Sequence, residues 1–293
     1  MPAKRFPLLL IAAFLAVYLI WGSTYLAIRI GVESWPPLLM AGIRFLLAGA
    51  LMYGWLRCRG VAAPTLAQWK LAGLLGVLLL ACGNGAVTVA EHLGVASGVA
   101  ALAIATEPLF FLLFGLFWGL RTTRLELTGI LLGLLGIVLL NLGSNLQASP
   151  LGAALVLFAS LTWAFGSMWS KHLPLPSGPM ASATQMLAGG AVLLLASLLS
   201  GEQLQHWPTP AGWAALAYLV VFGSIIAFSA YLYLLNSVRP AAASSYAYVN
   251  PPVAVLLGIV FAGEQIGTEE WLAMAVILTA VVLIGLPQWR RSG

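Results

Sequence analysis

Apolar residues in this chain form long, nearly unbroken runs separated by short polar segments. A helix needs about 20 apolar residues to cross roughly 30 Å of hydrocarbon, and the runs have this length. They lack the alternation of lipid-facing and lumen-facing positions that is typical of membrane-spanning strands. The pattern therefore predicts an all-α membrane protein with ten transmembrane helices, near residues 7–29, 37–56, 69–90, 96–118, 125–143, 151–170, 181–199, 212–236, 241–262 and 269–287.

Two of these runs carry a polar residue followed by proline near their middle. Glu107-Pro108 lies in the fourth run and Asn250-Pro251 in the ninth, 143 residues later. The segments around them align without a gap. The same offset relates the third to fifth runs to the eighth to tenth, which indicates an internal repeat.

Each copy of the repeat contains five predicted helices, residues 1–146 and 147–293. Because five is odd, the second copy must enter the membrane from the opposite face. The sequence thus predicts two five-helix inverted repeats. Many secondary transporters have this architecture and bind substrate near the membrane midplane, where the repeats meet.

Composition and charge agree with an integral membrane protein. Hydrophobic residues make up 61% of the chain, charged residues only 7%, and the mean hydropathy is +1.01, which leaves too little polar material for a soluble surface. With the N-terminus in the cytoplasm, eleven of the thirteen Lys and Arg residues fall on the inner side. This bias predicts that both termini are cytoplasmic. The basic pI reflects contact with the inner leaflet of the lipid bilayer, and no nucleic-acid partner is expected.

Several short motifs, in order along the chain, carry a family resemblance. They are Ile20-Trp-Gly-Ser-Thr-Tyr25, Gly42-Ile-Arg-Phe45, Gly83-Asn-Gly85, Glu91-His92, Thr106-Glu-Pro108, Ser245-Tyr-Ala-Tyr-Val-Asn-Pro-Pro252 and Gly263-Glu264. The chain resembles the drug/metabolite transporter superfamily, in particular its EamA branch. This resemblance implies a multi-pass permease of the bacterial inner membrane. It would export small metabolites such as amino acids, aromatic ones included, or toxic organic cations.

Glu107 is the most informative candidate site residue. A carboxylate at the bilayer centre costs about 2.5 kcal/mol or more unless it faces water, a partner or a cation. It should therefore point into the bundle. It would contact a substrate amine, act as a protonatable gate, or remain a protonated carboxyl hydrogen-bonded within the bundle.

The two prolines and the Asn250 amide are candidates for a hinge between helix segments. Pro108 and Pro251 should each remove one intrahelical hydrogen bond and kink a helix, which makes them candidate hinges or static kinks. Asn250 would satisfy the freed carbonyls or touch substrate. Tyr246 shares a helix face with Asn250 and is a candidate for the transport path, whereas Tyr248 cannot lie on that face.

The tryptophans divide into two groups. Eight lie near predicted helix ends, where membrane proteins carry an interfacial belt: Trp35, Trp55, Trp69, Trp118, Trp207, Trp213, Trp271 and Trp289. Trp21 and Trp163 instead lie inside the first and sixth helices, with Tyr25 close to Trp21. Their π faces would suit a flat aromatic ring or a cation, and core packing is the alternative. Asn84, between two glycines of the third helix, is a further candidate for lining the cavity.

Two further features concern packing and topology. Arg44 lies a few turns inside the second predicted helix and is expected to extend outward to the membrane surface, or to meet a carboxylate. Gly129, Gly133 and Gly136 predict a close-packing seam on the fifth helix, within the chain or in a homodimer. The oligomeric state is thus predicted as monomer or homodimer.

Two other function classes are the alternatives to a transporter. A membrane-embedded enzyme would need a catalytic constellation, yet the chain contains no Asp and its three His residues are scattered, so neither a catalytic site nor a metal or cofactor is expected. A channel usually has rotational symmetry around a pore, whereas the predicted symmetry is inverted within one chain. The sequence therefore favours a carrier that works by alternating access, with Trp21, Tyr25, Asn84, Glu107, Trp163, Tyr246 and Asn250 as candidate substrate-binding residues.

Overall fold

The computed structural model describes residues 8–95, 103–140, 150–262 and 267–292. Throughout these ranges every regular element is a helix, which confirms the all-α prediction. The predicted boundary between the halves, at residues 146 and 147, lies outside the described residues. Six helical segments are long and apolar enough to cross a membrane: Leu8–Val32, Pro37–Cys58, Leu66–His92, Pro150–Ser170, Pro179–Leu199 and Pro210–Ser237.

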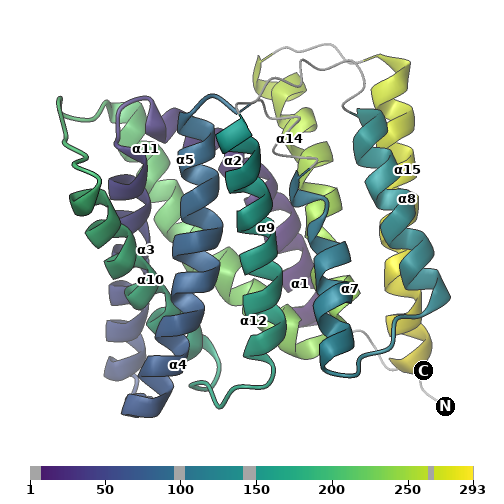
Figure 1. The fold of residues 1–293 in the computed structure, drawn as a ribbon, viewed down its shortest axis with the longest axis horizontal. Coiled ribbons are helices and arrows are strands. Elements are labelled where there is room, and N and C mark those ends of the chain that lie inside the picture. Colours follow the sequence, from purple (N-terminus) through teal and green to yellow (C-terminus); the bar gives the residue numbers. More distant parts are fainter. Residues whose placement is uncertain (1–7, 96–102, 141–149, 263–266, 293) are drawn as a thin grey trace.

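The helices lie side by side and run up and down the bundle (Figure 1). In the first half they are α1 (Leu8–Leu15), α2 (Trp21–Val32), α3 (Pro37–Cys58), α4 (Leu66–Gly76), α5 (Ala86–His92), α7 (Glu107–Phe117) and α8 (Arg124–Leu140). In the second half they are α9 (Pro150–Ser170), α10 (Pro179–Leu199), α11 (Pro210–Tyr218), α12 (Ala227–Ser237), α13 (Pro240–Ala243), α14 (Tyr246–Ala262) and α15 (Thr268–Ser292). The start of α1 and the end of α15 lie at the same end of the bundle, which we name the inner end; the opposite end is the outer end.

Three π-helical stretches join consecutive α-helices into longer segments. They are η1 (Ala16–Ile20) between α1 and α2, η2 (Val77–Gly85) between α4 and α5, and η3 (Leu219–Ile226) between α11 and α12. The stretches η2 and η3 occupy corresponding places in the third and eighth predicted helices. Such widened turns are rare and occur often at functional sites.

Helices of one half pack against helices of the other half, and equivalent helices make equivalent contacts. The second and seventh predicted helices pack against each other as α3 and α10, and the fifth and tenth as α8 and α15. The first helix, through α2, packs on α11 and α14, and the sixth, α9, packs on the corresponding η2 and α7. Each half therefore packs its first helix against the other half.

Glycines allow the closest of these helix contacts. A Cβ atom on Gly129 would lie 2.8 Å from the Ala280 carbonyl oxygen of α15, and one on Gly133 would lie 2.8 Å from the Tyr248 ring. Gly136 similarly faces Ile277. The glycine seam predicted on the fifth helix is thus a packing seam within the chain, and these three glycines are not free to serve a dimer interface.

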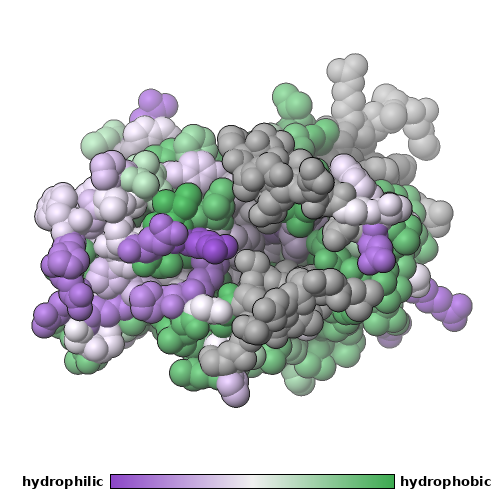
Figure 2. Space-filling model, turned by 90° about the horizontal axis from the view of Figure 1, so that it is seen from above, coloured by the Kyte–Doolittle hydropathy of each residue, from purple (hydrophilic) through white to green (hydrophobic). Residues whose placement is uncertain are grey.

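Large apolar side chains remain exposed along the flanks of the bundle, as expected where a helix faces lipid. Leu199 is 78% and Phe117 75% exposed. Seen from above, hydrophilic residues gather on the left of the view, with hydrophobic residues among and below them (Figure 2). Trp35 does not belong to the predicted interfacial belt, because it is 4% exposed and packs edge-on against Trp213, with 4.8 Å between ring centroids.

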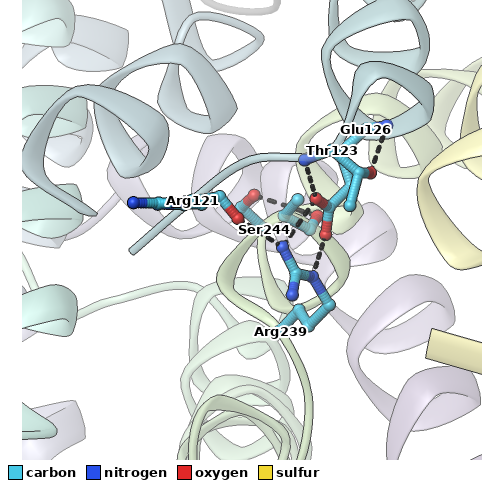
Figure 3. A network of polar contacts seen from close by, with 6 residues as sticks. Arg121, Thr123, Glu126, Arg239 and Ser244 are labelled. Atoms are coloured by element: carbon cyan, nitrogen blue, oxygen red, sulfur yellow. Dashed lines mark hydrogen bonds and ion pairs between the residues drawn. The ribbon is translucent and has the colours of Figure 1, made fainter. Parts of the chain in front are cut away.

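A polar network ties the two halves together at the inner end (Figure 3). Glu126 and Thr123 form a capping box at the start of α8, since the Thr123 amide donates to Glu126 Oε2 (2.7 Å) and the Glu126 amide to Thr123 Oγ1 (3.2 Å). Arg239, between α12 and α13, forms an ion pair with Glu126 and donates to the Arg121 carbonyl oxygen at 2.7 Å. We name this set the inner network.

Candidate functional site

The helix carrying Glu107 is interrupted directly before that residue. A turn at Ala105 and Thr106 precedes α7, which begins at Glu107. Pro108 thus lies in the first turn of α7, where a backbone N–H has no intrahelical acceptor in any case. The prediction that Pro108 removes a hydrogen bond and kinks a continuous helix is therefore wrong, because the helix restarts there instead.

The second half also has a helix break, but this break lies about one helical turn further from its proline than the break before Pro108 does. A turn at Ser244 and Ser245 separates α13 from α14, and Pro251 and Pro252 lie inside α14. Within a helix these prolines cannot donate to the carbonyls four residues before them. The two motifs match in sequence but are not structurally equivalent, since one proline starts a helix and the other interrupts one.

A cavity lies between the two halves beside these breaks. Its empty volume is about 680 Å³, open space at its mouth included. Residues from α2, α3, η2, α5, α7, α9, η3, α12 and α14 line it. All seven candidate residues lie in this wall: Trp21, Tyr25, Asn84, Glu107, Trp163, Tyr246 and Asn250.

Glu107 points into the bundle, as predicted from the free-energy cost of exposing a carboxylate to lipid. Its side chain is 6% exposed, lines the cavity, and accepts a hydrogen bond from the Tyr246 hydroxyl at 2.5 Å. No cation pairs with Glu107 within the described ranges. This carboxyl is therefore available to a positively charged group that enters the cavity.

Four aromatic rings from four different helices form one cluster beside the cavity, and three of them, Trp21, Trp163 and Tyr246, line it. Trp21 packs edge-on against Trp163 (5.5 Å between centroids) and against Tyr246 (5.0 Å), and Tyr231 contacts Trp21 at 5.1 Å. The Trp21 indole donates to the Gly223 carbonyl oxygen (3.1 Å) and the Trp163 indole to the Tyr231 hydroxyl (3.1 Å). Their polar atoms are thus paired, which fixes the rings.

Tyr231 is not among the residues that the sequence singles out, although it organises this aromatic cluster. It is fully buried and its hydroxyl also hydrogen-bonds Ser167 Oγ at 2.5 Å. Tyr231 does not line the cavity but supports Trp163 and Tyr246, which do. No sequence signal singles it out, because Tyr231 lies only five residues before the end of the eighth predicted helix, close to the interfacial positions where tyrosines are usual.

Asn250 and Tyr25 both line the cavity. With its amide nitrogen facing the backbone, Asn250 donates to the carbonyl oxygens of Tyr246 (3.2 Å) and Tyr18 (3.3 Å). Pro251 and Pro252 lack the N–H groups that would donate to the carbonyl oxygens of Ala247 and Tyr248. Asn250 therefore does not donate to the carbonyls that these prolines leave without a helical donor.

Tyr246 and Tyr248 point in different directions, as their spacing predicts. Tyr246 lines the cavity, whereas Tyr248 packs against Gly133 and donates to the Ile130 carbonyl oxygen at 2.9 Å.

Arg44 is the largest departure from the sequence predictions. It does not extend to the membrane surface, and no carboxylate pairs with it in the described part of the chain. Instead it is 3% exposed and lines the cavity, with Nε donating to Ser224 Oγ at 2.8 Å and Nη1 to Asn84 Oδ1 at 3.4 Å. The outward prediction is wrong because η2 and η3 offer polar partners inside the bundle.

Comparisons with known proteins place this chain in a family. The family model described as "EamA-like transporter family" matches the chain twice, at residues 8–142 and 150–286. The Escherichia coli K12 protein named "Uncharacterized inner membrane transporter YedA" is 54% identical over 280 residues, which cover 96% of this chain and 92% of that protein.

More distant relatives cover nearly the whole chain as well. Two proteins named "Probable amino-acid metabolite efflux pump" are 24% identical in Escherichia coli K12, covering 95% of each chain, and 28% identical in Salmonella typhimurium, covering 93% of each chain. A solved crystal structure superposes with a TM-score of 0.80 at 24% identity, over 97% of this chain and 98% of the other, and shows the same fold. The chain belongs to the EamA-like transporter family, as its motifs predicted.

Proposed function

We propose that this transporter is a multi-pass permease of the bacterial inner membrane that exports small metabolites by alternating access. Its ten helices form two inverted five-helix repeats, with both termini in the cytoplasm. The observation that carries the proposal is the cavity, because it lies between the two halves and both contribute to its wall. This is where inverted-repeat carriers bind substrate.

Two observations support the repeat. The family model matches each half separately. The helix contacts also exchange in the way that a twofold axis requires: α9 contacts η2 and α7, and α2 contacts the corresponding η3 and α14. A pair of halves related in this way has two alternative packings of similar energy, one open to each side of the membrane.

The cavity residues indicate which side is open in this conformation. The lining residues of α2 lie between Trp21 and Ile28, in the half of the first predicted helix that is nearer the outer end. On η2 and α5 they extend outward as far as Val87. We therefore infer that the cavity faces the outer side.

Several cross-half hydrogen bonds close the inner side beneath the cavity. Tyr18 bonds Ser245 (2.6 Å), Tyr246 bonds Glu107 (2.5 Å), and the inner network joins Arg239 to Glu126 still further in. An inward-facing state must break these contacts. The helix interruptions before Glu107 and around Pro251 lie next to them, and we propose Pro108 and Pro251 as the hinges of this movement.

The chemistry of the wall suits small solutes with an aromatic or cationic part. Trp21 and Trp163 offer ring faces, and Glu107, Tyr25, Asn84, Tyr246 and Asn250 offer polar atoms within a largely apolar cavity. We propose amino acids, aromatic ones included, or organic cations as substrates; two relatives are named as amino-acid metabolite efflux pumps. The described residues of a single chain line the cavity on both halves, which supports a monomer as the transporting unit, alone or within a homodimer.

Counterflow in proteoliposomes tests this function. Purified protein is reconstituted into liposomes loaded with an unlabelled amino acid, and entry of the same labelled amino acid is followed; a panel of aromatic and aliphatic amino acids and the organic cation ethidium is used. We expect saturable entry that is accelerated by substrate on the opposite side. Protein-free liposomes and the Glu107→Ala variant serve as controls.

The alternatives give different results in the same preparation. A channel would show ohmic single-channel currents and no acceleration by substrate on the opposite side. An enzyme would convert a compound of the panel into a product that chromatography detects. Either result, or no saturable flux of any compound in the panel, would overturn the proposal.

A further inference from the structure

Arg44 introduces a second buried charge into the cavity, beside the seven residues expected to bind substrate. Its guanidinium is 3% exposed and lies in the wall formed by α3, η2 and η3. An arginine stays protonated under ordinary conditions, and taking such a charge out of water costs several kcal/mol unless it is paired. No carboxylate of the described ranges pairs with it. The charge is therefore held without a protein counter-ion.

The donors of Arg44 are only partly used. Of the five N–H groups of a guanidinium, one donates to Ser224 Oγ and one to Asn84 Oδ1. The Phe45 ring lies beneath the group, with Cζ 4.6 Å from the ring centroid. These contacts orient the guanidinium as a fork, the geometry that binds a carboxylate by two parallel hydrogen bonds.

The surrounding backbone makes room for the guanidinium at this position. A Cβ atom on Gly223 would lie 2.9 Å from Arg44 Nη2 and 3.1 Å from Thr24 Cγ2. The carbonyl of Gly223 is itself held by the Trp21 indole. Both side-chain partners, Asn84 and Ser224, come from the π-helical stretches η2 and η3, so one element from each half orients Arg44.

Arg44 and Glu107 both line the cavity, and Trp21 contacts a neighbour of each. The Trp21 indole nitrogen bonds the carbonyl of Gly223, next to Arg44, and its ring packs against Tyr246, which bonds Glu107. A solute that carries only a positive charge would leave Arg44 buried and uncompensated. A solute with a carboxylate would neutralise it.

We propose that Arg44, oriented by Asn84 and Ser224, is the carboxylate-binding subsite of this cavity, so that transported solutes carry a carboxylate group. This inference rests on the proposed transport function and narrows its substrate class. It favours amino acids and other carboxylate-bearing metabolites over organic cations that lack an anionic group.

The test compares each amino acid that wild-type protein transports with its methyl ester, in which an uncharged ester replaces the carboxylate and adds one methyl group. Counterflow is measured with wild type, Arg44→Gln and Arg44→Lys. We expect the ester to be carried at least about 30-fold less efficiently by wild type, and Arg44→Gln to raise the KM for the amino acid by a similar factor, as for loss of one partner of a buried charged pair. Arg44→Lys should retain part of the affinity.

Two readouts separate this role from a purely structural one. In Arg44→Gln the ratio of amino acid to ester transport should fall towards one, a change that misfolding alone does not produce. Arg29→Gln removes an exposed arginine of α2 outside the cavity wall and should leave the ratio unchanged. Ser224→Ala should lower the same ratio less than Arg44→Gln does.

Failure of the inference is distinguishable from failure of transport. If wild type carries ethidium or the esters as well as the amino acids, or if Arg44→Gln keeps the wild-type ratio, Arg44 is not a carboxylate subsite although the protein remains a carrier. If wild type carries no compound of the panel, the proposed function itself is wrong, and the inference falls with it.

Discussion

The inner network should hold the observed conformation closed on its inner side, and breaking it should open that side. Glu126 is 1% exposed and Arg239 19% exposed, and both oxygens of Glu126 accept from Arg239. Arg239→Gln leaves the Glu126 carboxylate without this cation. Removing one partner of a fully buried ion pair costs about 3–5 kcal/mol. Because Arg239 is partly exposed, we expect Arg239→Gln to destabilise the conformation with the closed inner side by about 2–3 kcal/mol.

This cost converts directly into a change of population. Each 1.4 kcal/mol is a factor of ten, so the equilibrium between closed and open inner sides should shift by about 30-fold to 140-fold. The shift is expected because the ion pair joins α8 to the segment between α12 and α13, which must separate when the inner side opens.

Cysteine accessibility measures this shift. Cys58 and Cys82, the two cysteines of the chain, are first replaced by Ser. Ala241→Cys then places a thiol beside Arg239 and Glu126, in a small pocket that these residues line. The rate of labelling by a membrane-impermeant maleimide is measured in inside-out vesicles. We expect a faster rate in Arg239→Gln and in Glu126→Gln.

Two controls guard this interpretation. Arg57→Gln changes an exposed arginine at the inner end of α3 and should not alter labelling. The exchanged pair Arg239→Glu with Glu126→Arg should restore part of the wild-type rate. If both single variants label at the wild-type rate while remaining folded, the inner network does not contribute to closure and the reasoning is refuted.

Three further predictions concern the cavity and the helix seams. Glu107→Gln should flatten the pH dependence of counterflow if this carboxyl exchanges protons during transport, and an unchanged pH profile would exclude that role. Tyr246→Phe removes the hydroxyl that donates to Glu107 and should lower stability by about 1–3 kcal/mol, seen as a lower midpoint of thermal unfolding in detergent. Gly49→Ala should destabilise by about 1–3 kcal/mol, because its Cβ would lie 2.8 Å from the Leu187 amide nitrogen. Gly54→Ala, in the same helix with nothing within 4 Å, should be neutral or slightly stabilising; equal melting points for these two variants would contradict the packing account.

Properties that depend on short stretches of chain follow from the amino-acid sequence alone. The length of the apolar runs determines that the chain is an all-α membrane protein, since helix length must match the thickness of the bilayer. The position of Glu107 inside the bundle follows from the cost of a carboxyl in lipid. The seven candidate residues line one cavity because each is polar or aromatic in the middle of an apolar helix, where only the bundle interior accommodates it.

Other features depend on partners far away in sequence. Arg44 turns inward because Ser224, 180 residues later, and Asn84, 40 residues later, supply acceptors, and no local pattern reveals such partners. Tyr231 acquires its role from Trp163 and Ser167, which helix packing brings to it.

The helix breaks show the same division most clearly. The two matched motifs Glu107-Pro108 and Asn250-Pro251 mark by themselves where each half is weakened, because proline lacks an N–H wherever it occurs. Only the tertiary structure decided that α7 starts at Glu107 whereas α14 starts four residues before Asn250. The reason is physical: a missing donor is a property of one residue, but the place where a helix ends is set by the packing and hydrogen bonds of the helices around it.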